Sequence, residues 1–155
     1  LNTFVGTIPG ALPALGGYTA ATGTFGASGW VMFAILVCWQ IPHFYALAWM
    51  YRTDYARGGH QMLSVTQPDG KALLTNVVVF TVLMIGASLL PFWLGSGSIF
   101  YLAGASLLGL GFARSVYRFG VLMTNASAKQ LLKATVYYIP ALVLLIVLDR
   151  LLILA

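Results

Sequence analysis

Long apolar runs alternate with short polar connections along this chain, and they predict a series of membrane-spanning helices. Five runs can be drawn, at roughly residues 4–21, 29–51, 72–94, 98–117 and 131–154. Each is close to the roughly 20 mostly apolar residues that a spanning helix needs. The connection at 95–98 is short and uncharged, which favours a helical hairpin. We therefore expect an all-α, polytopic transmembrane bundle.

Composition supports a lipid environment. Hydrophobic residues make up 60% of the 155 residues and charged residues 7%, whereas soluble domains carry about 25% charged residues. The sequence has no linker or change of composition, so we expect one transmembrane domain over residues 1–155. Because the chain opens at Leu1 inside an apolar, glycine-rich stretch, we expect that the N-terminal half of this domain is missing.

The charges are unequally distributed between the connections. The basic residues gather in two regions and are Arg52, Arg57, Lys71, Arg114, Arg118, Lys129 and Lys133. The connections at 22–28 and 95–98 carry none. The positive-inside rule therefore predicts that the 52–71 and 114–133 loops are cytoplasmic. Since the net charge of +5 resides mainly in these short loops, it does not indicate a nucleic-acid partner. Asp149 and Arg150, near the far end of the last run, are expected to reach the outer interface by snorkelling, without a catalytic role.

The second run carries polar residues that a lipid-facing helix does not accommodate cheaply. Gln40 and His43 lie deep within it, and intramembrane polar groups usually face a protein interior or a water-filled cavity. At about 100° per residue, Gln40, His43 and Asp54 fall on one side of a continuous helix, with His43 and Asp54 roughly 16 Å apart along the axis. The pattern predicts a polar stripe from the membrane interior to an acid at its cytoplasmic rim.

More than one role is open for each polar residue at this point. Asp54 is one of three acidic residues; it either holds Mg²⁺ against a phosphate, with Arg52 and Arg57 binding phosphate oxygens, or forms an interfacial ion pair with an arginine. His43 either contacts haem, relays protons or hydrogen-bonds another helix. Trp39 and Trp49 favour packing or an interfacial position over a substrate box.

A resemblance to a known family narrows these alternatives. The segment Trp39-Gln40-Ile41-Pro42-His43-Phe44-Tyr45-Ala46-Leu47-Ala48, followed by Asp54-Tyr55-Ala56 and Met62-Leu63, closely resembles the most recognisable segment of the haem O synthases, or protohaem IX farnesyltransferases. Residues 2–6, 10–13 and 16 look like the middle of that family. The later runs fit by hydropathy and by Leu131-Leu132 and Tyr137-Tyr138 before the last span.

The resemblance implies an intramembrane prenyltransferase of the UbiA type, with about nine spans around a central cavity, of which about five are present here. This family transfers a farnesyl group from farnesyl diphosphate to a vinyl group of haem B, giving haem O for terminal oxidases. Mg²⁺ and two acid-containing cytoplasmic loops are thought to hold the diphosphate, and the Asp54 loop corresponds to the second. The resemblance also implies a bacterial inner membrane location and links to haem A synthase or oxidase assembly.

Residue by residue, the resemblance assigns catalysis and metal binding to one acid and substrate contacts to the polar residues near it. The acid is Asp54, and the substrate-contacting residues are His43, Gln40, Arg52, Arg57, Tyr51 and Lys71.

The chain also departs from the family pattern. The first Asn/Asp-rich motif is absent, Pro13-Ala14 replaces a double proline, and residues 59–64 replace a common Gly-x-Pro-Met-Leu-Pro pattern. We therefore expect this chain alone to be inactive. Two other functions stay open: a prenyltransferase with an aromatic or quinone-precursor acceptor, and a non-enzymatic haem-handling or transport protein.

Overall fold

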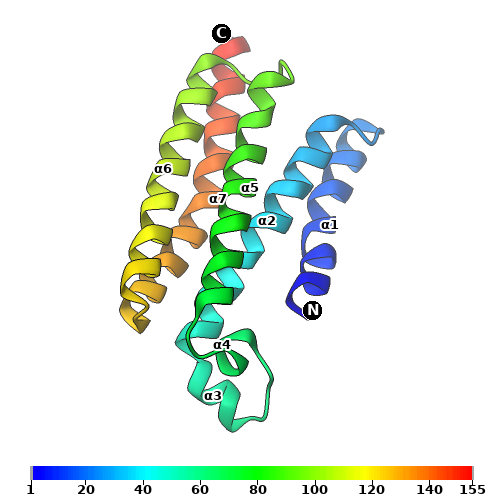
Figure 1. Ribbon diagram of the computed structural model, residues 1–155. Helices are drawn as coiled ribbons and strands as arrows, with labels where there is room; N and C mark the ends of the chain where they lie inside the picture. The colour runs from blue at the N-terminus through cyan, green and yellow to red at the C-terminus, as the bar shows by residue number, and fades with distance from the viewer. Residues whose placement is uncertain (1, 155) are drawn as a thin grey trace.

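Helices make up nearly all of the structure, a computed structural model that describes residues 2–154, with side chains from residue 5 onward (Figure 1). The five long helices are α1 (Asn2–Thr22), α2 (Ala27–Met50), α5 (Lys71–Trp93), α6 (Ile99–Leu122) and α7 (Asn125–Leu154). Two short helices, α3 (Arg52–Arg57) and α4 (Leu63–Thr66), lie in the connection between α2 and α5. No strand occurs among the described residues, and the all-α prediction is confirmed. The side chains of Asn2, Thr3 and Phe4, which contribute to the family resemblance, lie outside the described residues.

Four of the long helices, α2, α5, α6 and α7, are long and apolar enough to cross a membrane. Helix α1 has 21 residues, with Pro9 and Pro13 inside it, and within the described residues it is not one of these four. The last helix begins at Asn125 rather than near 131, and α6 continues to Leu122 rather than 117. The predicted 114–133 loop is therefore a two-residue turn at 123–124, because the basic residues on either side extend the helices beyond their apolar cores.

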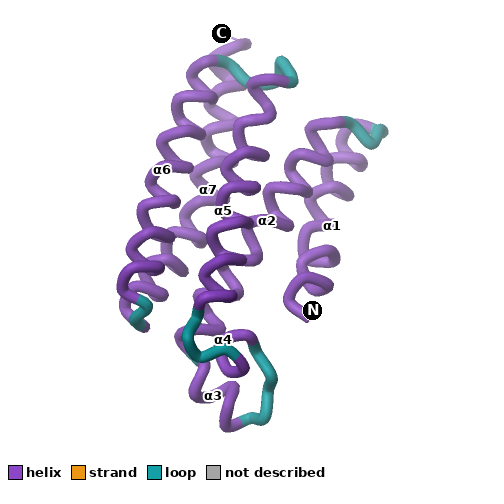
Figure 2. Tube along the Cα trace, in the orientation of Figure 1, coloured by secondary structure: helices purple, strands orange, loops and turns teal. Residues whose placement is uncertain are grey.

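Helix α2 is the central element of the bundle. It packs against α1, α5 and α7, while α6 packs between α5 and α7; among the described residues α1 packs on α2 alone. The long helices alternate in direction, so that the α3–α4 segment and the α6–α7 turn lie at one end (Figure 1). The two uncharged connections lie at the other end (Figure 2). Both basic regions thus share one end, as the charge pattern requires.

A buried polar network ties three helices together within the membrane-spanning region. The Tyr101 hydroxyl donates to the Ser88 carbonyl at 2.7 Å, and the Tyr138 hydroxyl donates to Ser88 Oγ at 3.0 Å. Ser88 Oγ itself donates to the Met84 carbonyl at 2.9 Å. Because lipid offers no hydrogen-bond partners, these hydroxyls are satisfied only when α5, α6 and α7 are in register.

Asp149 is a structural residue, and the prediction that it snorkels to the outer interface is wrong. Its side chain is 1% exposed, and its carboxylate accepts hydrogen bonds from the Ser98 backbone N–H, at 3.1 Å, and from the Ser98 hydroxyl. Ser98 is the N-cap of α6 and its Oγ accepts from the backbone N–H groups of Phe100 and Tyr101. The negative charge is therefore placed at the positive end of the α6 dipole.

Trp49 organises the end of the bundle that carries the α3–α4 segment. Its indole Nε1 donates to the Met123 carbonyl at 3.2 Å, and its ring meets the Phe119 ring edge-on. Gly70, which precedes α5 with φ +68°, lies directly beneath it: a Cβ there would be 2.2 Å from Met123 Cε and 2.9 Å from the Trp49 ring. This contact between Trp49, Gly70 and Met123, the Trp49 junction, joins α2, α5 and α6.

Gly70→Ala is expected to destabilise the protein by about 2 to 4 kcal/mol, since left-handed strain adds to overpacking against Trp49 and Met123. Gly95→Ala is the matched control, because Gly95 has φ +70° with nothing within 4 Å of its Cβ position; strain alone costs about 1 kcal/mol. Thermal unfolding in detergent measures both. Equal losses for the two variants would show that the Trp49 junction has no tight contact at Gly70.

Candidate functional site

Gln40 joins α1 to α2. Its side chain is 6% exposed, and Nε2 donates to the carbonyl of Thr7 on α1 at 3.1 Å and to that of Leu36 at 3.2 Å. The amide fits against α1 because residue 10 is glycine and has no side chain: a Cβ on Gly10 would be 2.3 Å from Gln40 Oε1. The prediction that Gln40 avoids lipid is confirmed, and its observed partner is the backbone of a neighbouring helix.

His43 and Trp39 face α7, where both reach Thr135. The Trp39 indole N–H donates to the Thr135 carbonyl at 2.7 Å, and His43 Nδ1 lies 2.8 Å from Thr135 Oγ1. The Thr135 hydroxyl is also 2.6 Å from the Leu132 carbonyl, to which it donates its one proton. Because the Thr135 hydroxyl proton is used for Leu132, the hydrogen bond between His43 and Thr135 needs a proton on His43 Nδ1. In a neutral imidazole the other nitrogen, Nε2, then carries the lone pair.

The His43 ring is held on more than one side. It stacks on the Trp39 ring, with centroids 5.1 Å apart and planes 27° apart, and meets the Phe44 ring edge-on. The ring is half-buried. Aromatic packing and the Thr135 contact thus fix the imidazole orientation, while part of the ring stays accessible for a ligand.

The predicted polar stripe is interrupted. Helix α2 ends at Met50, and Tyr51, with φ −103° and ψ 19°, separates it from α3. Asp54 therefore lies on a separate six-residue helix, and the expected continuous helix from His43 to Asp54 is wrong. The break follows from the different partners on each side of it, since Trp49 is fixed in the bundle while α3 is exposed.

Asp54 presents an accessible carboxylate at the basic end of the bundle. Its side chain is 65% exposed, and Arg57 Nη1 lies 3.8 Å from Oδ1. The alternative of an interfacial ion pair is thus present, but such an exposed pair contributes about 0 to 1 kcal/mol and leaves the carboxylate open to other ligands. Within the described part of the chain no three His, Cys, Asp or Glu side chains converge as a metal site. Asp54 is suited to being a single protein ligand of a divalent ion that phosphate and water complete.

Arg52 has a structural role that the sequence did not reveal. Nη1 donates to the Trp49 carbonyl at 2.7 Å and to Asn125 Oδ1 at 2.5 Å, and the guanidinium lies 4.7 Å from the centroid of the Trp49 ring. It therefore fastens α3 to the first residue of α7. The sequence shows only that Arg52 follows Trp49 by three residues, a spacing that allows a contact on a helix. It does not show the partner Asn125, which lies 73 residues further along the chain.

The remaining predicted residues lie around the same loop. Tyr51 is 48% exposed at the junction of α2 and α3, and Lys71 is the exposed first residue of α5. Only Asp54 and Arg57 are brought within ion-pair distance of each other, while Gln40 and His43 bond to different helices. The anchor of the loop is Ser64, whose buried hydroxyl donates to the Ala48 carbonyl at 2.8 Å.

The fold and this arrangement define a polytopic helical membrane protein with an acid-bearing loop fixed to one end of an apolar bundle. The chain belongs to the UbiA prenyltransferase family, whose model matches residues 1–139.

Curated relatives of the chain carry one name. A protein of Salinibacter ruber named protoheme IX farnesyltransferase is 51% identical over 96% of this chain and 52% of its own length. Proteins of the same name from Solibacter usitatus and Koribacter versatilis are 45% and 38% identical, over 96% of this chain and 51% and 50% of their own lengths. The chain thus spans about half the length of the curated relatives it matches. No solved structure gives a significant match.

Arg52→Gln is expected to destabilise the protein by about 2 kcal/mol, because it removes charge-assisted hydrogen bonds and a cation–π contact at the Trp49 junction. Arg57→Gln removes the same charge from a side chain that is 84% exposed, and the expected change is within about 0.5 kcal/mol. Thermal unfolding of both variants in detergent is the measurement. A destabilised Arg57 variant with an unaffected Arg52 variant would reverse these assignments.

Proposed function

We propose that the full-length protein transfers a farnesyl group from farnesyl diphosphate to a vinyl group of haem B, producing haem O. The observation that carries this proposal is the 51% identity to a protein named protoheme IX farnesyltransferase over 96% of the chain. The UbiA family match supports prenyl transfer as the reaction class. The positive-inside rule supports a cytoplasmic Asp54 loop, and the bacterial sources of the relatives support an inner membrane location. The haem O produced would pass to haem A synthase or to oxidase assembly.

The Asp54 loop is suited to the diphosphate. Asp54 would hold Mg²⁺, which supplies the neutralising charge for a diphosphate leaving group when it is bound. Arg57, exposed beside Asp54, and Lys71, exposed at the start of α5, are assigned to phosphate oxygens. Arg52 contacts substrate only through guanidinium nitrogens other than Nη1, which is occupied by Trp49 and Asn125. Tyr51 and the Gln40-bearing turn of α2 are assigned to the apolar part of the substrates.

The proposed reaction needs water as a further reactant, which supplies the hydroxyl group of the product. The allylic C–O bond of farnesyl diphosphate breaks, and diphosphate leaves with the electron pair. The haem vinyl group then supplies the electrons of the new C–C bond, and water adds to the neighbouring carbon with loss of a proton, giving the hydroxyethylfarnesyl side chain. The apolar bundle supports this order because it excludes water while the allylic cation exists.

His43 is assigned to haem. With Nδ1 donating to Thr135, Nε2 carries the lone pair that haem iron takes from a histidine. The Trp39 and Phe44 rings beside it offer apolar, aromatic surface suited to a porphyrin face. Thr135 is then a positioning residue that acts through His43 and makes no contact with substrate.

Asp54→Ala in the full-length protein is expected to abolish farnesyl transfer while haem B binding survives, since only the diphosphate site is lost. Mass spectrometry of haems from a synthase-deficient strain measures haem O, and a haem titration measures binding. Asp69→Ala is the control, because Asp69 is an exposed acid of the same connection. Undiminished haem O in the Asp54 variant would refute the metal–diphosphate role. Haem binding without haem O in the stably expressed wild type would favour a haem-handling protein instead.

His43→Ala is expected to shift the Soret band of bound haem B and weaken its binding. Thr135→Val, which removes the acceptor of the Nδ1 proton, is expected to weaken binding about tenfold, as loss of an outer-shell partner does at metal sites. Thr135→Ser keeps the hydroxyl and is expected to bind haem like the wild type. Titration curves of all three variants that coincide with the wild type would remove His43 from the haem site.

A further inference from the structure

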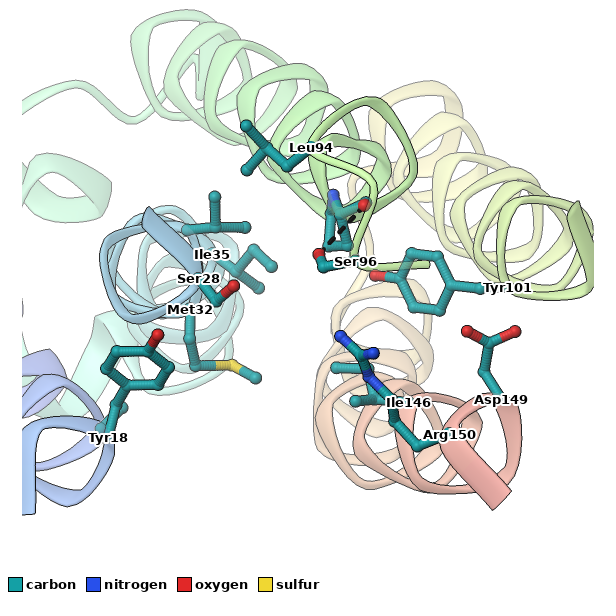
Figure 3. Close-up of a pocket in the computed structure, with 13 residues that line it drawn as sticks. Tyr18, Ser28, Met32, Ile35, Leu94, Ser96, Tyr101, Ile146, Asp149 and Arg150 are labelled. Carbon is teal, nitrogen blue, oxygen red and sulfur yellow. Dashed lines mark hydrogen bonds between the residues drawn. The ribbon is translucent and has the colours of Figure 1, made fainter. Parts of the chain in front are cut away.

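A cavity lies at the end of the bundle opposite the Asp54 loop. Its volume is about 340 Å³, within the range of ligand sites. All five long helices and the α5–α6 turn contribute to its walls (Figure 3). The apolar part of the wall includes Met32 and Ile35, and the polar part includes Tyr18, Asp149 and Arg150.

The cavity is separate from the proposed transferase site. On α2 it reaches only as far as Ile35, which is 15 residues before the end of that helix at Met50, or about 22 Å along the axis. Asp54 lies beyond that end. A ligand with its diphosphate at Asp54 therefore lies at one membrane surface, whereas this cavity lies at the other.

Two charged residues line this cavity, Asp149 and Arg150, and Arg150 is the one that carries positive charge. Its side chain extends from α7 into the space between α2 and the α5–α6 turn (Figure 3). The neighbouring Asp149 carboxylate is already occupied by the Ser98 N–H and hydroxyl. Within the described chain the ion pair between Asp54 and Arg57 is the only one within 4 Å, and no hydrogen bond links Arg150 to a described residue. Its guanidinium donors thus remain for a ligand or water.

The depth and chemistry of the cavity fit a particular class of ligand. Ser28 is the second residue of α2, Ser96 lies in the α5–α6 turn, and Arg150 is close to the end of α7; all three are at helix ends, where lipid headgroups lie. Ser28, Leu94 and Arg150 are exposed, so the cavity has an open mouth. A guanidinium binds phosphate oxygens in a bidentate manner, and an acyl chain fits the apolar wall below it.

We propose that this cavity binds an anionic phospholipid from the leaflet opposite the Asp54 loop, with its phosphate on Arg150 and the upper part of an acyl chain against Met32, Ile35 and Ile146. The phosphate accepts hydrogen bonds from guanidinium donors that have no acceptor among the described residues. The bound lipid fills the cavity that α1, α2 and α7 line.

Native mass spectrometry of the full-length protein in mild detergent tests the site, with phosphatidylglycerol, phosphatidylcholine and oleate as probes. The wild type is expected to retain one phosphatidylglycerol in preference to the other two. Arg150→Gln is expected to weaken its retention about tenfold or more, as loss of a charge-assisted hydrogen bond does. Met32→Trp, which fills the cavity but keeps the charge, is expected to weaken it as well. Arg118→Gln, at the other end of the bundle, is the matched control.

Three results would overturn the proposal: equal retention by the Arg150 variant and the wild type, an equal loss in the Arg118 variant, or tighter retention of oleate, which would assign the cavity to a carboxylate. Circular dichroism and elution volume check that each variant is folded. If Met32→Trp does not fold, Arg150→Lys replaces it, since it keeps the charge without the bidentate geometry, and its retention should fall between those of the wild type and Arg150→Gln.

Discussion

The bundle depends on one constraint, which is that polar groups on α2 have no water to bond within the membrane. Trp39 and His43 bond to α7, Gln40 to α1, and Trp49 to the end of α6. Each bond fixes the rotation and height of a neighbouring helix, because an unsatisfied group in lipid costs several kcal/mol. The polar residues that are unusual in the apolar run of α2 are therefore the ones that position the neighbouring helices.

The same constraint explains why residues assigned to the proposed substrate site, such as His43 and Arg52, also hold helices together. His43 is oriented by Thr135 and Trp39, which also hold α2 against α7. Arg52 fastens α3 to α7, and so determines where the Asp54 carboxylate is presented. The acid itself remains exposed, which leaves it accessible to the proposed diphosphate and metal ion.

Hydropathy predicted the number of long helices, their alternation and the gathering of basic residues at one end. It also indicated that Gln40 and His43 avoid lipid. It could not predict the partners, because Thr7, Thr135 and Asn125 are ordinary residues that become informative only when distant helices meet. The end of α2 was predicted to within one residue, but the separate helix α3 that follows it was not, since Trp49 is packed in the bundle while α3 is exposed. The early start of α7 was also missed, because Lys129 and Lys133 extend a helix outside the hydrocarbon.

The separation of α2 from its partners along the chain has a consequence for biosynthesis. Trp39 donates to a carbonyl 96 residues further on, and the His43 partner is 92 residues away. At a translation rate of about 5 to 20 residues per second, Thr135 leaves the ribosome on the order of 5 to 20 s after Trp39. During that interval the imidazole and indole of α2 need other hydrogen-bond partners, either in the insertion machinery or at the bilayer surface. Helix α2 therefore reaches its final set of hydrogen bonds only after the last helix has been made.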